Sequence, residues 1–380
     1  MTWRYTNVED VREEFVKAAH RKAVNFTELC QQFEISRKTG YKWLGRYQEG
    51  GTRNLSDRSR AAQNRPNETP NKIKNLVVET RKKFVHWGAK KIIPYLEKKH
   101  PNLVLPSKTT VGNILRREGL TPKSRASPRM ANTSPVTEAK YPNHVWTIDF
   151  KGWWKTGDNN VCEPLTVVDL YSKYILHLDH IESKSIEPVW KVLEKLFEQY
   201  GKPKMMRSDN GPPFASLAVG RLSKLSLRLI KAGITPEWTR PGKPQDNGSH
   251  ERMHRTFKAE VALDPAPTLK LQRKQCVEFK PYFNKIRPHE ALEMKTPSEV
   301  HVIADHSAKD GSLLEYPESY LLRKVECGGM ISMHGYRAFV SEMLRGEYIG
   351  AEPVSSQDYK LYYGPISIGS LNIYEGFKRF

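Results

Sequence analysis

Three short stretches of the sequence decide the fold: Val145-Trp-Thr-Ile-Asp149-Phe150, Met205-Met-Arg-Ser-Asp209-Asn-Gly211 and Pro244-Gln-Asp-Asn-Gly-Ser-His-Glu251-Arg-Met-His254. In the first two, an acid stands at the end of an apolar, β-prone run; in the third, Glu251 stands at the start of an expected helix. Three carboxylates brought together from two strand ends and a helix start form a hard-oxygen site suited to Mg²⁺. Two such ions can activate both ends of a phosphodiester exchange.

The sequence around these stretches alternates between strand and helix patterns, as it does in α/β domains. We expect strands over 146–150, 165–170, 174–178, 204–208 and 234–239, and helices over 186–200 and 217–232. Glycine-containing connections between the first three strands allow an antiparallel meander. This order predicts a ribonuclease-H-like core with a mixed five-stranded sheet, which we assign to residues 144–300.

The chain is strongly basic, with 62 Lys+Arg against 42 Asp+Glu and a formal net charge of +20. Most of the excess lies in residues 1–140, which favours a polyanionic partner, although a merely soluble basic surface is the alternative. No apolar run reaches the roughly 18 residues of a membrane span, and the N-terminus is no signal peptide. The four cysteines have neither zinc spacing nor a disulfide pattern, so we expect a cytoplasmic protein without a membrane partner.

Residues 1–50 have the pattern of a helix-turn-helix domain. A short turn follows Phe33, and Ser36 is placed to cap a basic helix over 37–47. In the helix-turn-helix design this second helix enters the major groove of DNA, and the alternative is an ordinary three-helix unit. The predicted DNA contacts of this helix are Arg37, Lys38, Lys42 and Arg46.

A second helical unit is expected over residues 67–120, after a basic linker over 51–66. Ser107 looks like the N-cap of its last helix, which stands where a recognition helix would. The predicted DNA contacts there are Lys108, Arg116 and Arg117. A proline-rich linker over 121–143 then leads into the core.

The C-terminal part reads as a small all-β domain. Residues 301–318 are polar and form an expected linker. Six short strand candidates with glycine-containing turns follow between 319 and 380, and they predict an SH3-like barrel. The chain is thus expected to be multidomain: two all-α helix-turn-helix units, an α/β core and a β tail.

Several motifs together resemble bacterial insertion-sequence transposases, whose catalytic core is similar to that of retroviral integrases. The motifs are Trp146-Thr-Ile-Asp149, Ser208-Asp-Asn-Gly211, Pro241-Gly-Lys-Pro-Gln-Asp-Asn-Gly248, His250-Glu-Arg-Met-His-Arg-Thr-Phe-Lys258, Tyr282-Phe-Asn-Lys-Ile-Arg-Pro-His-Glu-Ala-Leu292 and Lys295-Thr-Pro-Ser-Glu-Val300. The resemblance covers about residues 140–300, and the helix-turn-helix front is typical of the family too.

By this resemblance Asp149, Asp209 and Glu251 form an Asp-Asp-Glu triad that is both catalytic and metal-binding. It implies two Mg²⁺ ions, for which Mn²⁺ can substitute. The spacing from Asp209 to Glu251 is longer than usual in the family, and Asp246 stands nearer the usual place. We prefer Glu251 because it begins a helix with a polar face, whereas an Asx turn explains Asp246.

The resemblance also implies a loop and a basic surface around the triad. We expect the active-site loops to be formed by Asn210, Gly211, Gln245, Asn247 and Gly248. The predicted DNA contacts near the core are Lys243, Arg252, His254, Arg255 and Lys258. His254, Arg255 and Lys258 are placed here because they share the expected polar helix face with Glu251.

The implied function is DNA transposition. Such an enzyme binds the terminal inverted repeats of an insertion sequence, cleaves at the 3′ ends and joins the 3′-hydroxyls to target DNA. We expect a homodimer or higher oligomer on double-stranded DNA, in the bacterial cytoplasm and associated with the nucleoid. Two alternatives stay open: a DNA-binding regulator with an inactive core, and a structure-selective nuclease.

Overall fold

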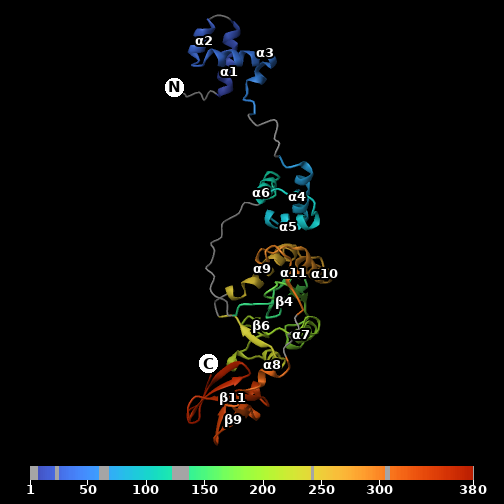
Figure 1. The fold of residues 1–380 in the computed structure, drawn as a ribbon, viewed down its shortest axis with the longest axis vertical. Helices are drawn as coiled ribbons and strands as arrows, with labels where there is room; N and C mark the ends of the chain where they lie inside the picture. Colours follow the sequence, from blue (N-terminus) through green and yellow to red (C-terminus); the bar gives the residue numbers. More distant parts are fainter. Residues whose placement is uncertain are drawn as a thin grey trace. The chain divides into compact units, whose positions relative to one another are not determined.

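The computed structural model describes residues 7–21, 25–59, 68–121, 137–240, 244–303 and 309–379. The chain divides into two compact units, residues 1–68 and residues 69–380. The second unit holds three helices, an α/β core and a C-terminal group of strands (Figure 1). Across these described ranges, no helix has the length and apolar character needed to cross a membrane.

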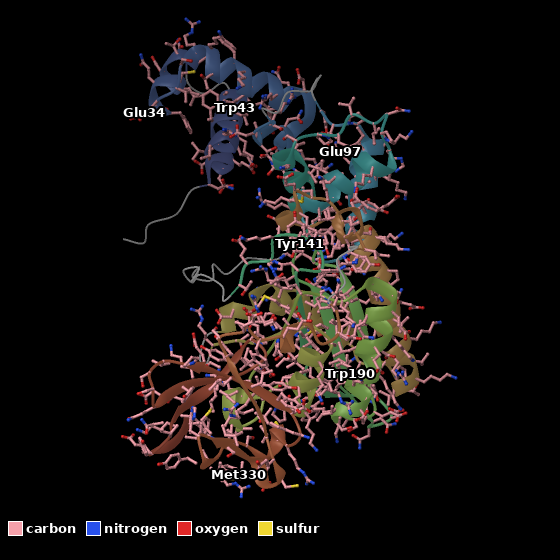
Figure 2. All side chains as sticks on the ribbon, turned by 60° about the horizontal axis from the view of Figure 1, so that its bottom comes forward. Glu34, Trp43, Glu97, Tyr141, Trp190 and Met330 are labelled. Carbon is pink, nitrogen blue, oxygen red and sulfur yellow. The ribbon has the colours of Figure 1, made fainter. Side chains whose placement is uncertain are left out.

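The first unit is a three-helix domain, as the sequence predicts. Its helices are α1 (Val8–Arg21), α2 (Phe26–Gln32) and α3 (Arg37–Gly50). Phe15, Leu29 and Trp43 contribute one side chain from each helix to a single buried cluster; Trp43 is labelled in Figure 2. The hydroxyl of Ser36 accepts a hydrogen bond from the backbone N–H of Thr39, which confirms the predicted cap of α3.

The second unit begins with three more helices. They are α4 (Asn71–Lys83), α5 (Ala89–Lys99) and α6 (Lys108–Arg117). Ser107 caps α6 as predicted, by accepting from the backbone N–H of Thr110. These helices contact the core directly, because the indole Nε1 of Trp87 donates to the hydroxyl of Tyr282 at 2.9 Å.

The core is built on a mixed five-stranded sheet, which confirms that part of the predicted fold. Its order is β5-β4-β1-β6-β7. The strands are β1 (Val145–Phe150), β4 (Pro164–Asp169), β5 (Ile175–His180), β6 (Met205–Ser208) and β7 (Thr235–Trp238). β1 runs antiparallel to β4 and parallel to β6. A short hairpin that the sequence patterns do not predict pairs β2 (Trp154–Lys155) with β3 (Val161–Cys162).

Helices cover both faces of this sheet. They are α7 (Ile186–Tyr200), α8 (Lys224–Lys231), α9 (Gly248–Phe257), α10 (Leu269–Pro281) and the short α11 (Pro297–Val300). Val167 of β4 belongs to the buried cluster that includes side chains of α7 and α8, whereas Val168 belongs to the cluster that includes those of α9 and α10. Because successive strand residues point to opposite faces, the two helix pairs lie on opposite sides of the sheet.

One predicted helix is shorter than expected. The apolar pattern over 217–232 predicts one continuous helix, but α8 begins only at Lys224. Gly220 has φ of +59°, and Ser223 forms a capping box with Ser226, so the helix cannot extend back through this segment. Residues 219–221 form a separate 3₁₀ turn instead.

The C-terminal part is all β, but the predicted SH3-like barrel is not confirmed. Its strands are β8 (Leu321–Lys324), β9 (Met330–Met333), β10 (Tyr336–Phe339), β11 (Tyr348–Pro353), β12 (Asp358–Tyr363), β13 (Ile366–Asn372) and β14 (Gly376–Arg379). Five of them form an open sheet ordered β14-β13-β12-β11-β8, and β9 pairs with β10. Among the residues that the structure describes, no strand pairing joins the edges β14 and β8 into a closed barrel. The last strand, β14, is an element that the sequence patterns do not predict.

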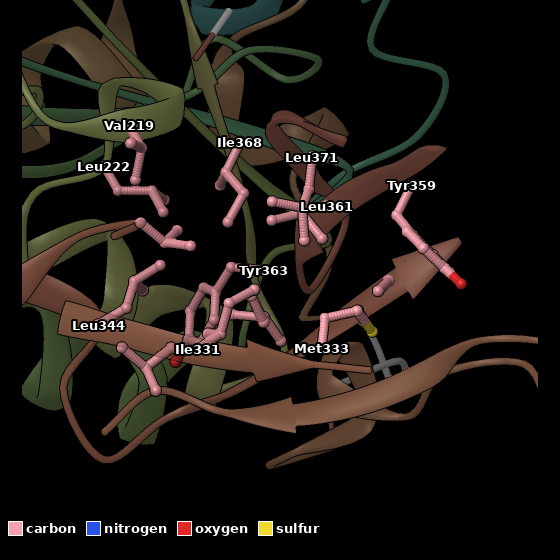
Figure 3. Close-up of a cluster of buried hydrophobic side chains, with 14 of the residues drawn as sticks. Val219, Leu222, Ile331, Met333, Leu344, Tyr359, Leu361, Tyr363, Ile368 and Leu371 are labelled. Carbon is pink, nitrogen blue, oxygen red and sulfur yellow. The ribbon is translucent and has the colours of Figure 1, made fainter. Parts of the chain in front are cut away.

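The C-terminal strands share a hydrophobic core with the α/β core. Leu222 and Ile230, from the segment before α8 and from α8 itself, lie in one buried cluster with Ile331, Tyr363 and Ile368. Figure 3 shows Leu222 and Val219 facing Ile368 and the neighbouring strand residues. The β tail is therefore packed against the core through apolar side chains rather than attached by a linker alone.

Candidate active site

The parallel pairing of β1 and β6 brings Asp149 and Asp209 to the same edge of the sheet. The register matches Trp146 with Met206 and Thr147 with Arg207, so its continuation places Asp149 opposite Asp209. Asp209 follows β6 directly, and its Oδ1 accepts the backbone N–H of Gly211 at 3.1 Å. Glu251 lies in the first turn of α9 and is exposed.

The three carboxylates interact electrostatically. The pKa of Asp149 is raised to about 7, first by burial, then by the charge of Asp209, with a further contribution from Glu251. The side chain of Asp149 is 23% exposed, whereas Asp209 and Glu251 are exposed residues. Carboxylate oxygens are ligands that a hard divalent cation prefers, and its charge would remove the repulsion. Among the described residues, the ligand atoms within 4.8 Å of one another belong to Asp149, His250 and His254, and neither Asp209 nor Glu251 joins that group.

Asp246, the alternative third acid, is engaged elsewhere. Its carboxylate accepts three hydrogen bonds from Arg240, from the backbone N–H at 3.0 Å, from Nε at 2.9 Å and from Nη2 at 2.6 Å. The side chain is fully buried, and the bonds to Arg240 lower its pKa to about 2. A carboxylate with these partners is a structural group of the loop before α9, which supports the choice of Glu251.

A buried ion pair also stabilises the loop that precedes α9. Arg207 of β6 pairs with Glu237 of β7, with 2.6 Å between Nε and Oε2, and both side chains are buried. The Nη1 group of Arg207 also donates to the backbone carbonyl of Asp246 at 3.0 Å. The strands therefore fix the start of α9, on which Glu251 lies.

The structure corrects the prediction that His254 lies on an exposed polar face of α9 with Glu251. This side chain is buried, and its Nε2 lies 2.8 Å from the hydroxyl of Thr166 on β4. Because α9 begins at Gly248, its inner face carries His250 and His254 one turn apart, against the strands. The prediction that His254 contacts DNA is therefore wrong, because the side chain is buried against the sheet. Met253, Phe257 and Val261 are also buried.

Four residues of the site are not among the sequence predictions: Thr147, Lys151, Thr166 and His250. Asp149, His250 and His254 each offer a ligand atom, and these atoms lie within 4.8 Å of one another. Two histidines four residues apart on one helix are a recognisable signal. Nothing in the sequence indicates that they face Thr147 and Thr166.

The predicted loop residues occupy the edges of the site. The amide of Asn210 donates to the carbonyl of Thr239 at 2.7 Å and accepts from Arg221 at 3.2 Å. Asn247 is buried, and Gly248 is the first residue of α9. Lys243 lies outside the described residues, and so does the side chain of Gln245.

Basic side chains are exposed on and directly after the helix of Glu251. Arg252 and Arg255 lie on α9, and Lys258 is the residue that follows its last turn. The first two line a groove together with Lys173 and Lys91. Burial, and after it the nearby charge of Arg252, lower the pKa of Lys173 to about 8. This crowding of positive charges favours a polyanion in the groove.

The predicted recognition helices also present basic groups. Arg37, Lys38 and Lys42 on α3 are exposed, whereas the guanidinium of Arg46 lies 4.8 Å from the centre of the Trp43 ring. On α6 the exposed basic residues are Lys108, Arg116 and Arg117. Their contacts with DNA stay predictions.

Family comparisons agree with this architecture. An integrase core domain model matches residues 139–244, and a second one matches residues 232–297. A helix-turn-helix domain model matches residues 11–62, and a homeodomain-like model matches residues 39–115. The chain therefore resembles integrase cores over residues 139–297 and helix-turn-helix or homeodomain-like domains in the part before them.

Curated relatives point in the same direction. The chain is 31% identical over 160 residues to the insertion element IS407 uncharacterized 31.7 kDa protein of Burkholderia multivorans, covering 42% of this chain and 55% of that protein. It is 25% identical over 190 residues to the Gag-Pol polyprotein of baboon endogenous virus, covering 50% of this chain and 10% of the polyprotein. The chain thus spans about half of the first relative and a small part of the second.

Two solved structures illustrate the structural likeness. The HTLV-2 integrase catalytic core domain in complex with magnesium is 18% identical, with a TM-score of 0.34, over 43% of this chain and 100% of that one. A chain of the simian T-cell lymphotropic virus intasome in complex with a PP2A regulatory subunit is 16% identical, with a TM-score of 0.38, over 77% of this chain and 97% of that one.

Proposed function

We propose that this protein is a DNA transposase that cleaves at the 3′ ends of an insertion sequence and joins them to target DNA. The observation that carries the proposal is the placement of Asp149 and Asp209 at adjacent strand ends beside the helix of Glu251. Burial, and after it the charge of Asp209, raise the pKa of Asp149 to about 7. A cluster of repelling carboxylates destabilises the fold without a cation, so its presence favours a metal-dependent function. The integrase core around it supports phosphoryl transfer as the reaction.

Each carboxylate has a distinct place in the proposed reaction. Asp149 and Asp209 lie on adjacent strand ends and are positioned to share one ion, while Glu251 approaches from α9. Two Mg²⁺ ions, or Mn²⁺ in their place, would supply charge stabilisation and a lowered pKa for the attacking water or 3′-hydroxyl. The pairs Arg207–Glu237 and Arg240–Asp246 hold the protein groups in position.

Double-stranded DNA is proposed both as the molecule that carries the insertion-sequence ends and as the target. We assign the terminal inverted repeats to the two helix-turn-helix units, through α3 and α6. The phosphate backbone near the scissile bond is assigned to three exposed residues: Arg252 and Arg255 on the helix that carries Glu251, and Lys258 directly after it. Since transposition joins two ends, the working form is a homodimer or higher oligomer assembled on DNA.

Strand transfer with oligonucleotides tests the proposal. The DNA carries the terminal repeats that flank the gene, and the product is a joined strand that depends on Mg²⁺ or Mn²⁺. We expect Asp149→Asn, Asp209→Asn and Glu251→Gln to abolish joining while retaining binding to the repeats. Normal joining by any of the three variants would contradict the proposed site.

The same assay separates the two alternatives. A regulator with an inactive core would bind the repeats and give no metal-dependent product. A structure-selective nuclease would cut DNA without inserting ends into a target. Joined products from the wild-type protein would exclude both.

A further inference from the structure

The hydroxyl of Thr166 organises the two histidines of α9. It donates to the backbone carbonyl of Asp149 at 2.8 Å, and it lies 2.6 Å from His250 Nε2 and 2.8 Å from His254 Nε2. A hydroxyl has one hydrogen to donate, and a carbonyl oxygen can only accept it. Because that hydrogen goes to Asp149, both Nε2 atoms must carry hydrogens and donate to Thr166.

The second nitrogens of the two rings then have different surroundings. The hydroxyl of Thr147 lies 2.6 Å from His250 Nδ1 and 3.3 Å from the carbonyl oxygen of Val168. The shorter contact assigns its one hydrogen to Nδ1, so both nitrogens of His250 are engaged. His254 Nδ1 lies 3.8 Å from Asp149 Oδ2. Because Nε2 donates to Thr166, the lone pair of the neutral imidazole of His254 is on Nδ1.

The lone pair on His254 Nδ1 therefore lies beside the carboxylate of Asp149. A neutral imidazole whose other nitrogen donates to a fixed oxygen is the usual arrangement of a histidine ligand. His250 does not qualify, although it lies close to both, because its lone pair is used by Thr147.

We infer that His254 is a fourth metal ligand of the triad and gives its Nδ1 to the ion bound by Asp149. This inference rests on the proposed function, which assigns that ion to Asp149, Asp209 and Glu251. Thr166 is the positioning residue, since it orients the ring through Nε2 and is itself held by the backbone of β1.

A nitrogen ligand changes which ion the site prefers. Imidazole suits transition metals, whereas Mg²⁺ prefers oxygen ligands and strict octahedral geometry. The ion beside Asp149 and His254 should therefore favour Mn²⁺ over Mg²⁺ more than three carboxylates would. Replacing His254 with asparagine keeps a polar side chain and removes the imidazole nitrogen.

The test detects the nitrogen directly in the full-length protein with Mn²⁺. Electron spin echo envelope modulation should show coupling of bound Mn²⁺ to a ¹⁴N nucleus, and labelling only the histidines with ¹⁵N should change it. His254→Asn should lose this coupling. His180→Asn, at a half-buried histidine of β5 outside the group, should keep it. By titration calorimetry, His254→Asn should weaken Mn²⁺ binding about tenfold and Mg²⁺ binding less.

The spectrum of the wild-type protein tests whether a histidine binds Mn²⁺ even if a variant fails to fold. Bound Mn²⁺ without histidine coupling, or coupling that persists in His254→Asn, would overturn the fourth ligand. In that case loss of Mn²⁺ binding in Asp149→Asn would leave the proposed function intact. A wild-type protein that binds no Mn²⁺ would overturn both.

Discussion

Asp149 is held in a position that is unfavourable for its charge. Its pKa of about 7 in the fold, against the usual 3.8, means that the folded state binds the proton more tightly than the unfolded state. Stability that is present below pH 4 is therefore lost as the pH rises through 7. In metal-free protein we expect Asp149→Asn to be more stable than wild type at pH 8, by roughly 1 to 4 kcal/mol, and the difference to vanish near pH 4.

Thermal or denaturant unfolding at the two pH values measures this effect. Asp264→Asn is the control, because it removes an exposed acid outside the triad and should change little at either pH. Saturating Mg²⁺ should stabilise wild type and not Asp149→Asn, since only the former holds the complete site. Equal stabilisation of both proteins by Mg²⁺ would contradict the role of Asp149.

Replacement of Glu251 and of Asp246 by the corresponding amides should have opposite effects on metal affinity and on stability. Glu251 is exposed, so Glu251→Gln should leave the unfolding midpoint nearly unchanged and weaken metal binding. Asp246 is buried with Arg240, so Asp246→Asn should cost about 1 to 3 kcal/mol of stability and leave metal affinity largely intact. Calorimetric titration with Mn²⁺ and thermal unfolding of both variants separate them; a reversed pattern would make Asp246 the third acid.

For individual residues, the sequence predicts the positions that follow from the local pattern of apolar and polar side chains. Asp149 and Asp209 end apolar runs that the sequence predicts as strands, and the resemblance implies that they lie together. The parallel pairing that brings these strand ends side by side is seen only in the structure. The commitment of Asp246 to Arg240 depends on a side-chain contact that no spacing specifies. The burial of His254 depends on Thr166, which is distant in sequence and lies on the strand opposite Asp149.

The exposed basic face of α9 should bind DNA without regard to sequence. Arg252 and Arg255 project from the helix that carries Glu251 and line the groove with Lys173. We expect Arg252→Ala and Arg255→Ala each to weaken binding to any duplex. Each should lower the slope of log affinity against log salt by about 0.9, as for one lost phosphate contact.

Fluorescence anisotropy over a salt series measures these slopes. Lys195→Ala removes an exposed lysine of α7 that no prediction places at DNA, and it should leave the slope unchanged. An effect limited to the terminal-repeat sequence would instead indicate that the two arginines read bases.

Elements with a strong pattern are predicted well, and interrupted ones are not. The amphipathic pattern over 186–200 coincides with α7. The pattern over 217–232 does not give one helix, because Gly220 has φ of +59° and Ser223 caps α8. Leu222, before this cap, packs against strands of the β tail such as β9 and β13, which lie more than 100 residues further along the chain, so local periodicity could not reveal its role.

In the whole molecule the β tail shares a hydrophobic core with the α/β core, whereas residues 1–68 form a separate compact unit. The predicted β tail is present, yet strand patterns could not show whether its edges close, since closure depends on pairing between distant strands. Nor could they show that the tail completes a core with α8. By contrast, residues 1–68 form a compact unit of their own.

Two truncations should therefore have different consequences for folding. Removal of residues 319–380 would expose Leu222, Leu227 and Ile230, which are buried against the β tail. Exposure of this apolar surface should lower the unfolding midpoint of the remaining core and promote aggregation. Removal of residues 1–68 should leave the core cooperatively folded and able to bind Mn²⁺, while terminal-repeat binding weakens. Calorimetry and light scattering of the two fragments test this, and a stable, monodisperse fragment that ends at residue 318 would show that the β tail is an independent module.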